Sequence, residues 1–316
     1  MKILVTGACG YKGTRLVPQL LAKGWQVVAL DTMWFGNFLE PHPQLEVIRG
    51  DVRDHYGVNL AGIDVIIHLA SIANDPCGDL DPKLTWEVSA LATMKLADEA
   101  ARAGVKQFIY ASSGSVYGVK EEDQVTEDLR LEPISEYNKT KMCAERILLS
   151  YADRMAVQIV RPATVCGPSP RMRFDVSVNM LTIQALERKR ITVFGGDQTR
   201  PNIHIDDITG LYVFLAENPQ ITGIYNAGFE NMSIMDIART VTRYAPAEIV
   251  VTPSNDPRSY RLSSNRLLAT GFRPRKTVAN AIQEIIALYQ EGTLKDADRF
   301  HNLRWMQNVV FPRAAE

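Results

Sequence analysis

Two polar segments of the sequence hold residue types that can transfer a proton. The first, Ser112 to Ser115, directly follows an apolar run that ends at residue 111. The second contains Tyr137 and Lys141, which share one face of a helix because they are four residues apart in a stretch without proline or glycine. A free tyrosine has a pKa of roughly 10, and a nearby ammonium group stabilises its phenolate. We therefore predict that Lys141 lowers the pKa of Tyr137 and makes it a competent base.

A glycine-rich turn near the N-terminus predicts a dinucleotide site. Gly7, Gly10 and Gly13 follow a short apolar run at residues 2–6 and precede a helical pattern. Glycine permits a tight turn and a close backbone approach to a pyrophosphate, which the N-terminal end of the helix also attracts. Asp31 ends the next predicted strand, and its carboxylate can accept the ribose hydroxyls but would repel a 2′-phosphate. The sequence therefore favours NAD over NADP.

The segments that carry these residues alternate between predicted strands and helices. This alternation predicts an α/β fold built on a doubly wound parallel sheet, in which ligands collect at the carboxyl ends of the strands. Beyond about residue 168 the order becomes less regular, which predicts a smaller C-terminal α/β substrate-binding lobe. We expect strands at residues 2–6, 25–30, 45–49, 63–68, 106–111, 156–160 and 191–194, and helices at about 83–103, 134–153, 175–188, 233–244 and 277–291.

The change of pattern also sets the expected domain boundaries. The first lobe spans residues 1–168, and residues 199–230 are expected to return to it. The smaller lobe comprises residues 169–198 and 231–295. Residues 296–316 show no clear pattern and stay unassigned.

The composition argues against several classes of protein. The chain has 316 residues, a formal net charge of -1 and no long run of one charge, which argues against a nucleic-acid partner. No apolar stretch approaches the length that spans a bilayer, and we expect a cytoplasmic protein without a membrane partner. Cys9, Cys77, Cys143 and Cys166 lie far apart, so we expect free thiols and no metal site.

These motifs together resemble the extended short-chain dehydrogenase/reductase family, in particular its NAD-dependent nucleotide-sugar epimerases and dehydratases, the group of UDP-galactose 4-epimerase. The resemblance covers roughly residues 1–290 and implies an NAD-binding Rossmann domain. It implies that Tyr137 is the general base, that Lys141 holds the nicotinamide ribose, and that Ser113 hydrogen-bonds the reacting sugar hydroxyl. The implied cofactor-binding residues are Gly7, Gly10, Tyr11, Lys12, Gly13, Asp31, Asp51, Val52, Leu69, Ala70, Ser71, Tyr137, Lys141 and Pro162. The implied substrate-binding residues are Asn74, Asp75, Ser113, Ser115, Asn179, Arg200 and Arg258.

The segment between Ser113 and Tyr117 departs from the pattern of the dehydratases. Those enzymes carry at least a glutamate there, whereas this chain has Gly114 and Ser115. Eliminating water needs an acid and a base beside the reacting carbons. We therefore expect an NAD-dependent epimerase of a nucleotide-diphosphate sugar that acts by transient oxidation at C4. Two alternatives stay open, namely a 4-ketoreductase or other oxidoreductase on a nucleotide-linked keto-sugar, and a non-catalytic NAD-binding protein.

Two further expectations concern structure outside the cofactor motifs. The resemblance implies a homodimer formed by the helices at about 83–103 and 134–153. His204 and Asp207 are expected to form a hydrogen-bonded network at the end of a strand.

Overall fold

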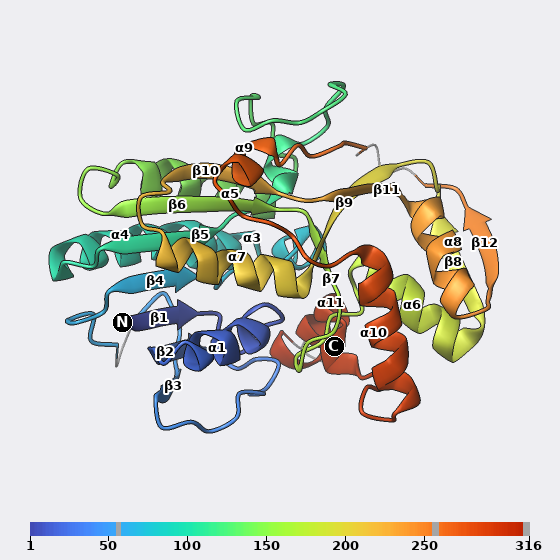
Figure 1. Ribbon diagram of the computed structural model, residues 1–316, viewed down its shortest axis with the longest axis horizontal. Helices are drawn as coiled ribbons and strands as arrows, with labels where there is room; N and C mark the ends of the chain where they lie inside the picture. The colour runs from blue at the N-terminus through green and yellow to red at the C-terminus, as the bar shows by residue number, and fades with distance from the viewer. Residues whose placement is uncertain (55–57, 255–258, 312–316) are drawn as a thin grey trace, which may run out of the picture.

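A seven-stranded sheet forms the centre of the protein in the computed structural model, which describes residues 1–54, 58–254 and 259–311 (Figure 1). All neighbouring strands are parallel, in the order β10-β6-β5-β4-β1-β2-β3. The order reverses at β1, which confirms the predicted doubly wound α/β fold. The strands are β1 (Lys2–Thr6), β2 (Gln26–Asp31), β3 (Leu45–Arg49), β4 (Val65–His68), β5 (Gln107–Ala111), β6 (Ala156–Pro162) and β10 (Gly223–Ala227).

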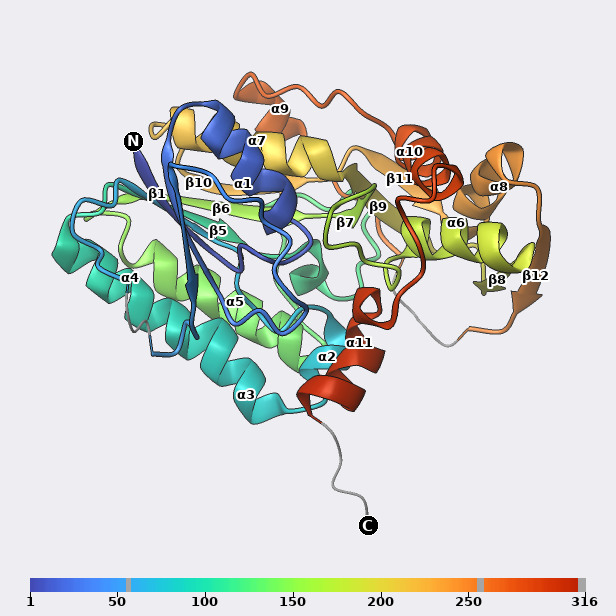
Figure 2. The same cartoon turned by 90° about the horizontal axis from the view of Figure 1, so that it is seen from below.

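Helices cover both faces of this sheet. Figure 2 shows α1 (Gly13–Ala22) and α7 (Ile205–Glu217) on one face, with α4 (Ala92–Ala103) and α5 (Glu136–Leu149) on the other. Strands covered on both faces need apolar side chains on both, which explains why β4 and β5 are continuous buried runs rather than alternating ones.

The helical pattern predicted at residues 83–103 contains an irregular turn. It consists of α3 (Pro82–Trp86), a π-helical turn η1 (Glu87–Leu91) and then α4. A π turn adds a residue without ending the helix, so the apolar spacing gave no sign of it. Ser89, inside this turn, lies with its Oγ 3.1 Å from Ser71 Oγ beyond the end of β4.

A smaller group of elements lies beyond the carboxyl ends of the central strands (Figure 1). Its helices α6, α8 and α10 pack on one another, and its strands form the sheets β11-β9-β7 and β12-β8. Between these pieces, the chain passes through α7 and β10, which pairs in parallel with β6 of the central sheet. The elements are β7 (Thr164–Cys166), α6 (Ser177–Arg188), β8 (Arg190–Phe194), β9 (Thr199–His204), β11 (Glu230–Ser233), α8 (Ile234–Tyr244), β12 (Glu248–Thr252) and α10 (Val278–Gln290). The short helix α9 (Asn265–Ala269) returns to the central sheet, where it contacts β10.

The last described residues form short helical turns rather than an extended tail. They are η3 (Asp298–Phe300), α11 (Asn302–Trp305) and the π turn η4 (Met306–Val310). Within residues 1–54, 58–254 and 259–311, no helix combines the length and the apolar character needed to cross a membrane.

Candidate active site

A cavity of about 600 Å³ opens at the carboxyl ends of the central strands and is lined by both lobes. Because parallel strands end on the same edge of the sheet, motifs far apart in the sequence meet there. Most of the predicted site residues line this cavity. They are Gly7, Gly10, Tyr11, Lys12, Gly13, Asp31, Asp51, Val52, Leu69, Ala70, Ser71, Asn74, Asp75, Ser113, Ser115, Tyr137, Pro162 and Arg200.

The glycine turn between β1 and α1 is shaped for close approach of a ligand. Gly7 has a φ of 69°, and a Cβ there would lie 2.7 Å from the backbone nitrogen of Ala70. A Cβ at Gly13 would clash with the carbonyl of Ala8, so α1 can begin this close to the sheet only with glycine. The carboxylate of Asp31 accepts hydrogen bonds from the backbone N–H groups of Cys9 and Met33, 2.9 and 2.7 Å away. The turn and the acid therefore form one preorganised wall of the cavity.

The predicted proton-transfer residues come together from β5 and α5. Ser113 Oγ lies 2.7 Å from Ser115 Oγ, and Ser115 Oγ donates to Asn138 Oδ1 at the start of α5. The Ser113 hydroxyl lies close enough to Tyr137 to favour the phenolate form of the tyrosine, and both residues line the cavity. Helix α5 begins where Ser135 Oγ accepts from the N–H of Asn138 at 3.2 Å, a side-chain cap that places Tyr137 in the first turn.

Lys141 lies behind Tyr137 rather than on the wall of the cavity. Its ammonium donates to the carbonyl of Ala111 at 2.8 Å and lies 5.8 Å from the ring centroid of Tyr137. Burial lowers the pKa of Lys141 well below its usual value, and the nearby charge of Lys12 adds to the effect. The two residues share a helix face as predicted, with the lysine on the side of the sheet.

The structure contradicts the predicted lowering of the Tyr137 pKa. Burial and the charge of Asp75 raise the pKa of Tyr137 to about 12, whereas the Ser113 hydroxyl and the charge of Arg173 oppose the rise only in part. The spacing rule identifies which side chains meet on a helix, but it does not include the cost of removing a phenolate from water.

A buried ion pair lies behind the segments that carry Ser113, Tyr137 and Lys141, on the side away from the cavity. Arg161 on β6 forms a two-pronged contact with Glu145, one turn after Lys141, with nitrogen to oxygen distances of 2.9 and 2.6 Å. Ser112 donates to the same carboxylate, and Arg161 donates to the hydroxyl of Tyr117 at 2.7 Å. Both charged side chains are at most 2% exposed. One carboxylate thus links the ends of β5, α5 and β6.

The loop before α2 (Asp75–Gly78) meets the second lobe across the cavity. Asn74 donates to Asp175 Oδ2 at 2.9 Å, and Asp175 also receives two hydrogen bonds from Arg173, at 2.9 and 2.8 Å. The charge of Arg173 helps to hold the pKa of Asp175 below its usual value against the effect of burial. This loop therefore faces the region between the lobes.

One predicted substrate residue, Asn179, does not line the cavity. Asn179 is fully buried, where its amide donates to the hydroxyl of Tyr11 at 3.1 Å and to the carbonyl of Arg173 at 2.9 Å. Asn179 therefore supports the loop that carries Arg173, and its contact with a substrate stays a prediction. Arg258 lies outside the described residues.

Several lining residues were not predicted from the sequence. Trp34 and Phe35 follow Asp31, Tyr260 comes from the second lobe, the charged residues follow the Gly167-Pro168 turn, and the last two come from the unassigned tail. The available signal was the two arginines within six residues of a glycine and proline at a strand end. The missed residues are Trp34, Phe35, Arg171, Arg173, Asp175, Tyr260, Asn302 and Leu303.

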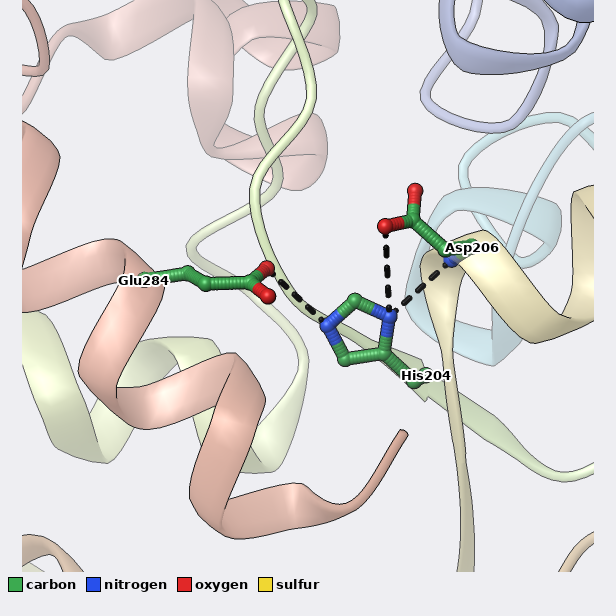
Figure 3. Close-up of side chains that lie close together, drawn as sticks. All are labelled: His204, Asp206 and Glu284. Atoms are coloured by element: carbon green, nitrogen blue, oxygen red, sulfur yellow. Dashed lines mark hydrogen bonds and ion pairs between the residues drawn. The ribbon is translucent and has the colours of Figure 1, made fainter. Parts of the chain in front are cut away.

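His204, Asp206 and Glu284 form a separate polar cluster between α7 and α10 (Figure 3). The N–H of Asp206 donates to His204 Nδ1 at 3.1 Å, and His204 Nε2 lies 3.1 Å from Glu284. The ammonium of Lys276 contacts Asp206 at 2.7 Å and Glu284 at 2.6 Å, so it occupies the place between the carboxylates that a metal cation would need. The backbone N–H of Lys276 also donates to Asp207 at 3.0 Å. The predicted strand-end network around His204 and Asp207 is confirmed.

Comparison with known proteins identifies the class. The model of the NAD dependent epimerase/dehydratase family matches residues 3–228, and the chain belongs to this family. The resemblance predicted from the motifs is therefore confirmed, and the cofactor is NAD. The glycine turn and Asp31 fit it, since no side chain fills the space at the start of α1.

The relatives include both epimerases and a dehydratase. UDP-glucose 4-epimerase of Mycolicibacterium smegmatis is 32% identical over 229 residues, which are 67% of this chain and 72% of that protein. dTDP-glucose 4,6-dehydratase of Streptomyces griseus is 27% identical over 312 residues, 92% of this chain and 94% of that protein. The structure of MoeE5 in complex with UDP-glucose and NAD is 26% identical, with a TM-score of 0.81 over 92% of this chain and 99% of that one.

Proposed function

We propose that this protein is an NAD-dependent epimerase that inverts a carbon of a nucleotide-diphosphate sugar, namely C4, through a transient keto-sugar. The observation that carries the proposal is that Ser113 and Tyr137 meet on the wall of the cavity, beside the glycine turn, with the Lys141 ammonium 5.8 Å from the Tyr137 ring. A protein that only binds NAD has no need of this pair.

The side chains of the site have distinct roles in this proposal. Ser113 orients the reacting hydroxyl, and Tyr137 takes its proton and later returns it. Lys141 stabilises the phenolate electrostatically and keeps α5 against the end of β5 through its bond to Ala111. Bound NAD supplies the acceptor that takes a hydride from the sugar and gives it back.

Charge around the cavity supports a diphosphate substrate. Arg200 lines the cavity from β9 of the second lobe, and guanidinium groups bind phosphate oxygens with two parallel hydrogen bonds. Asn74 and Asp75 line it from the first lobe, where hydroxyl-rich ligands find acceptors. We propose that the diphosphate contacts Arg200 and that the sugar contacts the loop before α2.

Gly114 and Ser115 supply neither an acid nor a base, so we propose that the enzyme does not eliminate water from the sugar. Gly114 packs instead near Tyr260, since a Cβ at Gly114 would lie 3.6 Å from the Tyr260 hydroxyl. Asp75 is near enough to Tyr137 for its charge to raise the tyrosine pKa. The Asp75 carboxylate is therefore the group that would favour a dehydratase, and the product must be identified chemically.

The test is product analysis by NMR after incubation with UDP-, GDP-, CDP- and dTDP-sugars. We expect an epimerised sugar and no accumulation of NADH. A product lighter by one water would show a dehydratase, and stoichiometric consumption of NADH with a keto-sugar would show a reductase; either result overturns the proposal.

Tyr137→Phe removes the hydroxyl and keeps the ring. We expect turnover to fall by at least about 100-fold, because proton transfer contributes that much to such reactions. NAD binding, measured by calorimetry, should stay within a few-fold of the wild type. Full activity of Tyr137→Phe would exclude the proposed base.

We also propose a homodimer that forms through the helices at residues 82–103 and α5. Leu91 and Met94 are 53% and 45% exposed on η1 and α4, and because they are three residues apart they form an apolar pair on one helix face. Packing of these helices against their copies would bury both side chains.

A further inference from the structure

The C-terminal residues 298–311 extend beyond the family match, which ends at residue 228. They form η3, α11 and η4, and α11 lies beside α2 at the edge of the cavity (Figure 2). Asn302 and Leu303 of this segment line the same cavity as the glycine turn and Asp31. The segment is therefore part of the cofactor end of the site.

Aromatic contacts fix the segment to the loop that follows β2. The indole N–H of Trp305 donates to the carbonyl of Trp34 at 2.7 Å, and the rings of Trp34 and Phe311 meet edge to face at 5.6 Å. The rings of Phe300 and Phe38 are 6.2 Å apart. This loop starts directly after Asp31, so the contacts cover the part of the cavity where the adenosine ribose is expected.

A second set of contacts fixes the segment to Arg171. The guanidinium of Arg171 donates to Asn302 Oδ1 at 2.6 Å and lies 4.0 Å from the ring centroid of Phe35. The backbone N–H of Arg171 donates to Thr14 in the first turn of α1 at 3.4 Å. Arg171 is thus held between the glycine turn, the loop after Asp31 and the C-terminal segment.

The charge of Arg171 is poorly compensated by the described residues. Its side chain is 2% exposed, its hydrogen bonds go to the neutral Asn302 amide and the Met172 carbonyl, and its Nε has no partner there. Burial and the charge of Arg173 lower the pKa of Arg171, while the charges of Asp175 and Asp31 act in the opposite direction. A buried cation without a paired carboxylate is costly, and an anionic ligand removes that cost.

We propose that residues 298–311 form a strap that closes the adenosine end of the NAD site and holds Arg171, through Asn302, as a ligand for the phosphates of the cofactor. The strap joins the loop after β2 to the loop that carries Arg171, so the cofactor leaves only when these contacts open. The release of NAD should therefore be slow, whichever reaction the enzyme catalyses.

The first experiment measures NAD release from the holoenzyme by exchange with an excess of a fluorescent NAD analogue. Trp305→Phe keeps the packing of the strap but loses its hydrogen bond to Trp34, and Asn302→Ala frees Arg171. We expect each variant to release NAD about tenfold faster, the effect of losing one buried hydrogen bond of this kind. Arg304→Ala is the matched control, because Arg304 is in the same segment but its partner is the exposed Asp298. Release rates equal to that control would overturn the strap.

The second experiment separates a charge role from a structural one. Asn302→Asp preserves the hydrogen bond with Arg171 and supplies the missing negative charge, so it should stabilise the segment against heat. If Arg171 binds phosphate, the same variant should bind NAD about tenfold more weakly by calorimetry, because the new carboxylate competes with and repels the phosphates. Unchanged or tighter NAD binding would overturn the role of Arg171.

Discussion

The pKa of the Lys12 ammonium should change when a ligand binds in the cavity. Lys12 lines the cavity in the glycine turn, and burial together with the charge of Arg173 lowers its pKa to about 8. A diphosphate beside the ammonium favours the charged form. Binding of NAD should therefore take up a proton in the range above pH 8.

The sign of this linkage gives a testable pH dependence. The free protein loses the charge of Lys12 above pH 8, so the affinity for NAD should fall by about tenfold or more between pH 7 and pH 10. Lys12→Arg keeps its charge throughout this range and should flatten the profile. Calorimetric titrations of both proteins at each pH provide the measurement, and an equally steep profile for Lys12→Arg would contradict the role of Lys12.

The Glu145–Arg161 pair acts at the scale of secondary-structure elements. It joins the helix that carries Tyr137 and Lys141 to β6, and Ser112 extends the link to the end of β5. This link fixes the end of β5 relative to α5. The position of Ser113, which follows β5, relative to Tyr137 on α5 therefore depends on it. Neither charged residue touches the cavity, so they are positioning residues.

Removing one member of the pair leaves a buried charge without a partner. Arg161→Met should lower the free energy of unfolding by about 3–5 kcal/mol, measured by urea denaturation, whereas the double variant Glu145→Gln with Arg161→Met should recover much of that loss. Arg102→Met removes an exposed pair with Asp98 and should cost less than about 1 kcal/mol. A cost for Arg161→Met no larger than this control would contradict the argument.

At the scale of the whole molecule, the helical face of residues 82–103 is the candidate contact between two copies. Aspartate at both Leu91 and Met94 would place two charges in the proposed interface. We expect the wild type to have the mass of a dimer by light scattering and the double variant to have the mass of a monomer, with an unchanged circular dichroism spectrum. A monomeric wild-type protein would contradict the proposal.

The local motifs could be predicted from the sequence because their geometry depends on residues that are close together in the chain. Glycines at a strand-to-helix turn require a close backbone approach, and a tyrosine and lysine four residues apart meet on a helix whatever surrounds them. The fold class could also be predicted, because buried parallel strands need continuous apolar runs. The pKa of Tyr137 could not, since it depends on how deeply other segments bury the hydroxyl.

What the sequence by itself determined about this protein is the doubly wound sheet, the glycine turn with Asp31, and the placement of Ser113 and Tyr137 at one edge. Only the tertiary structure decided that Asn179 supports a loop, that Arg171 and Arg173 reach the cavity, and that Asn302 and Leu303 of the tail line it. Trp305 and Trp34 are separated by 271 residues along the chain. No periodicity relates residues so far apart, because their contact is selected by the packing of complete elements.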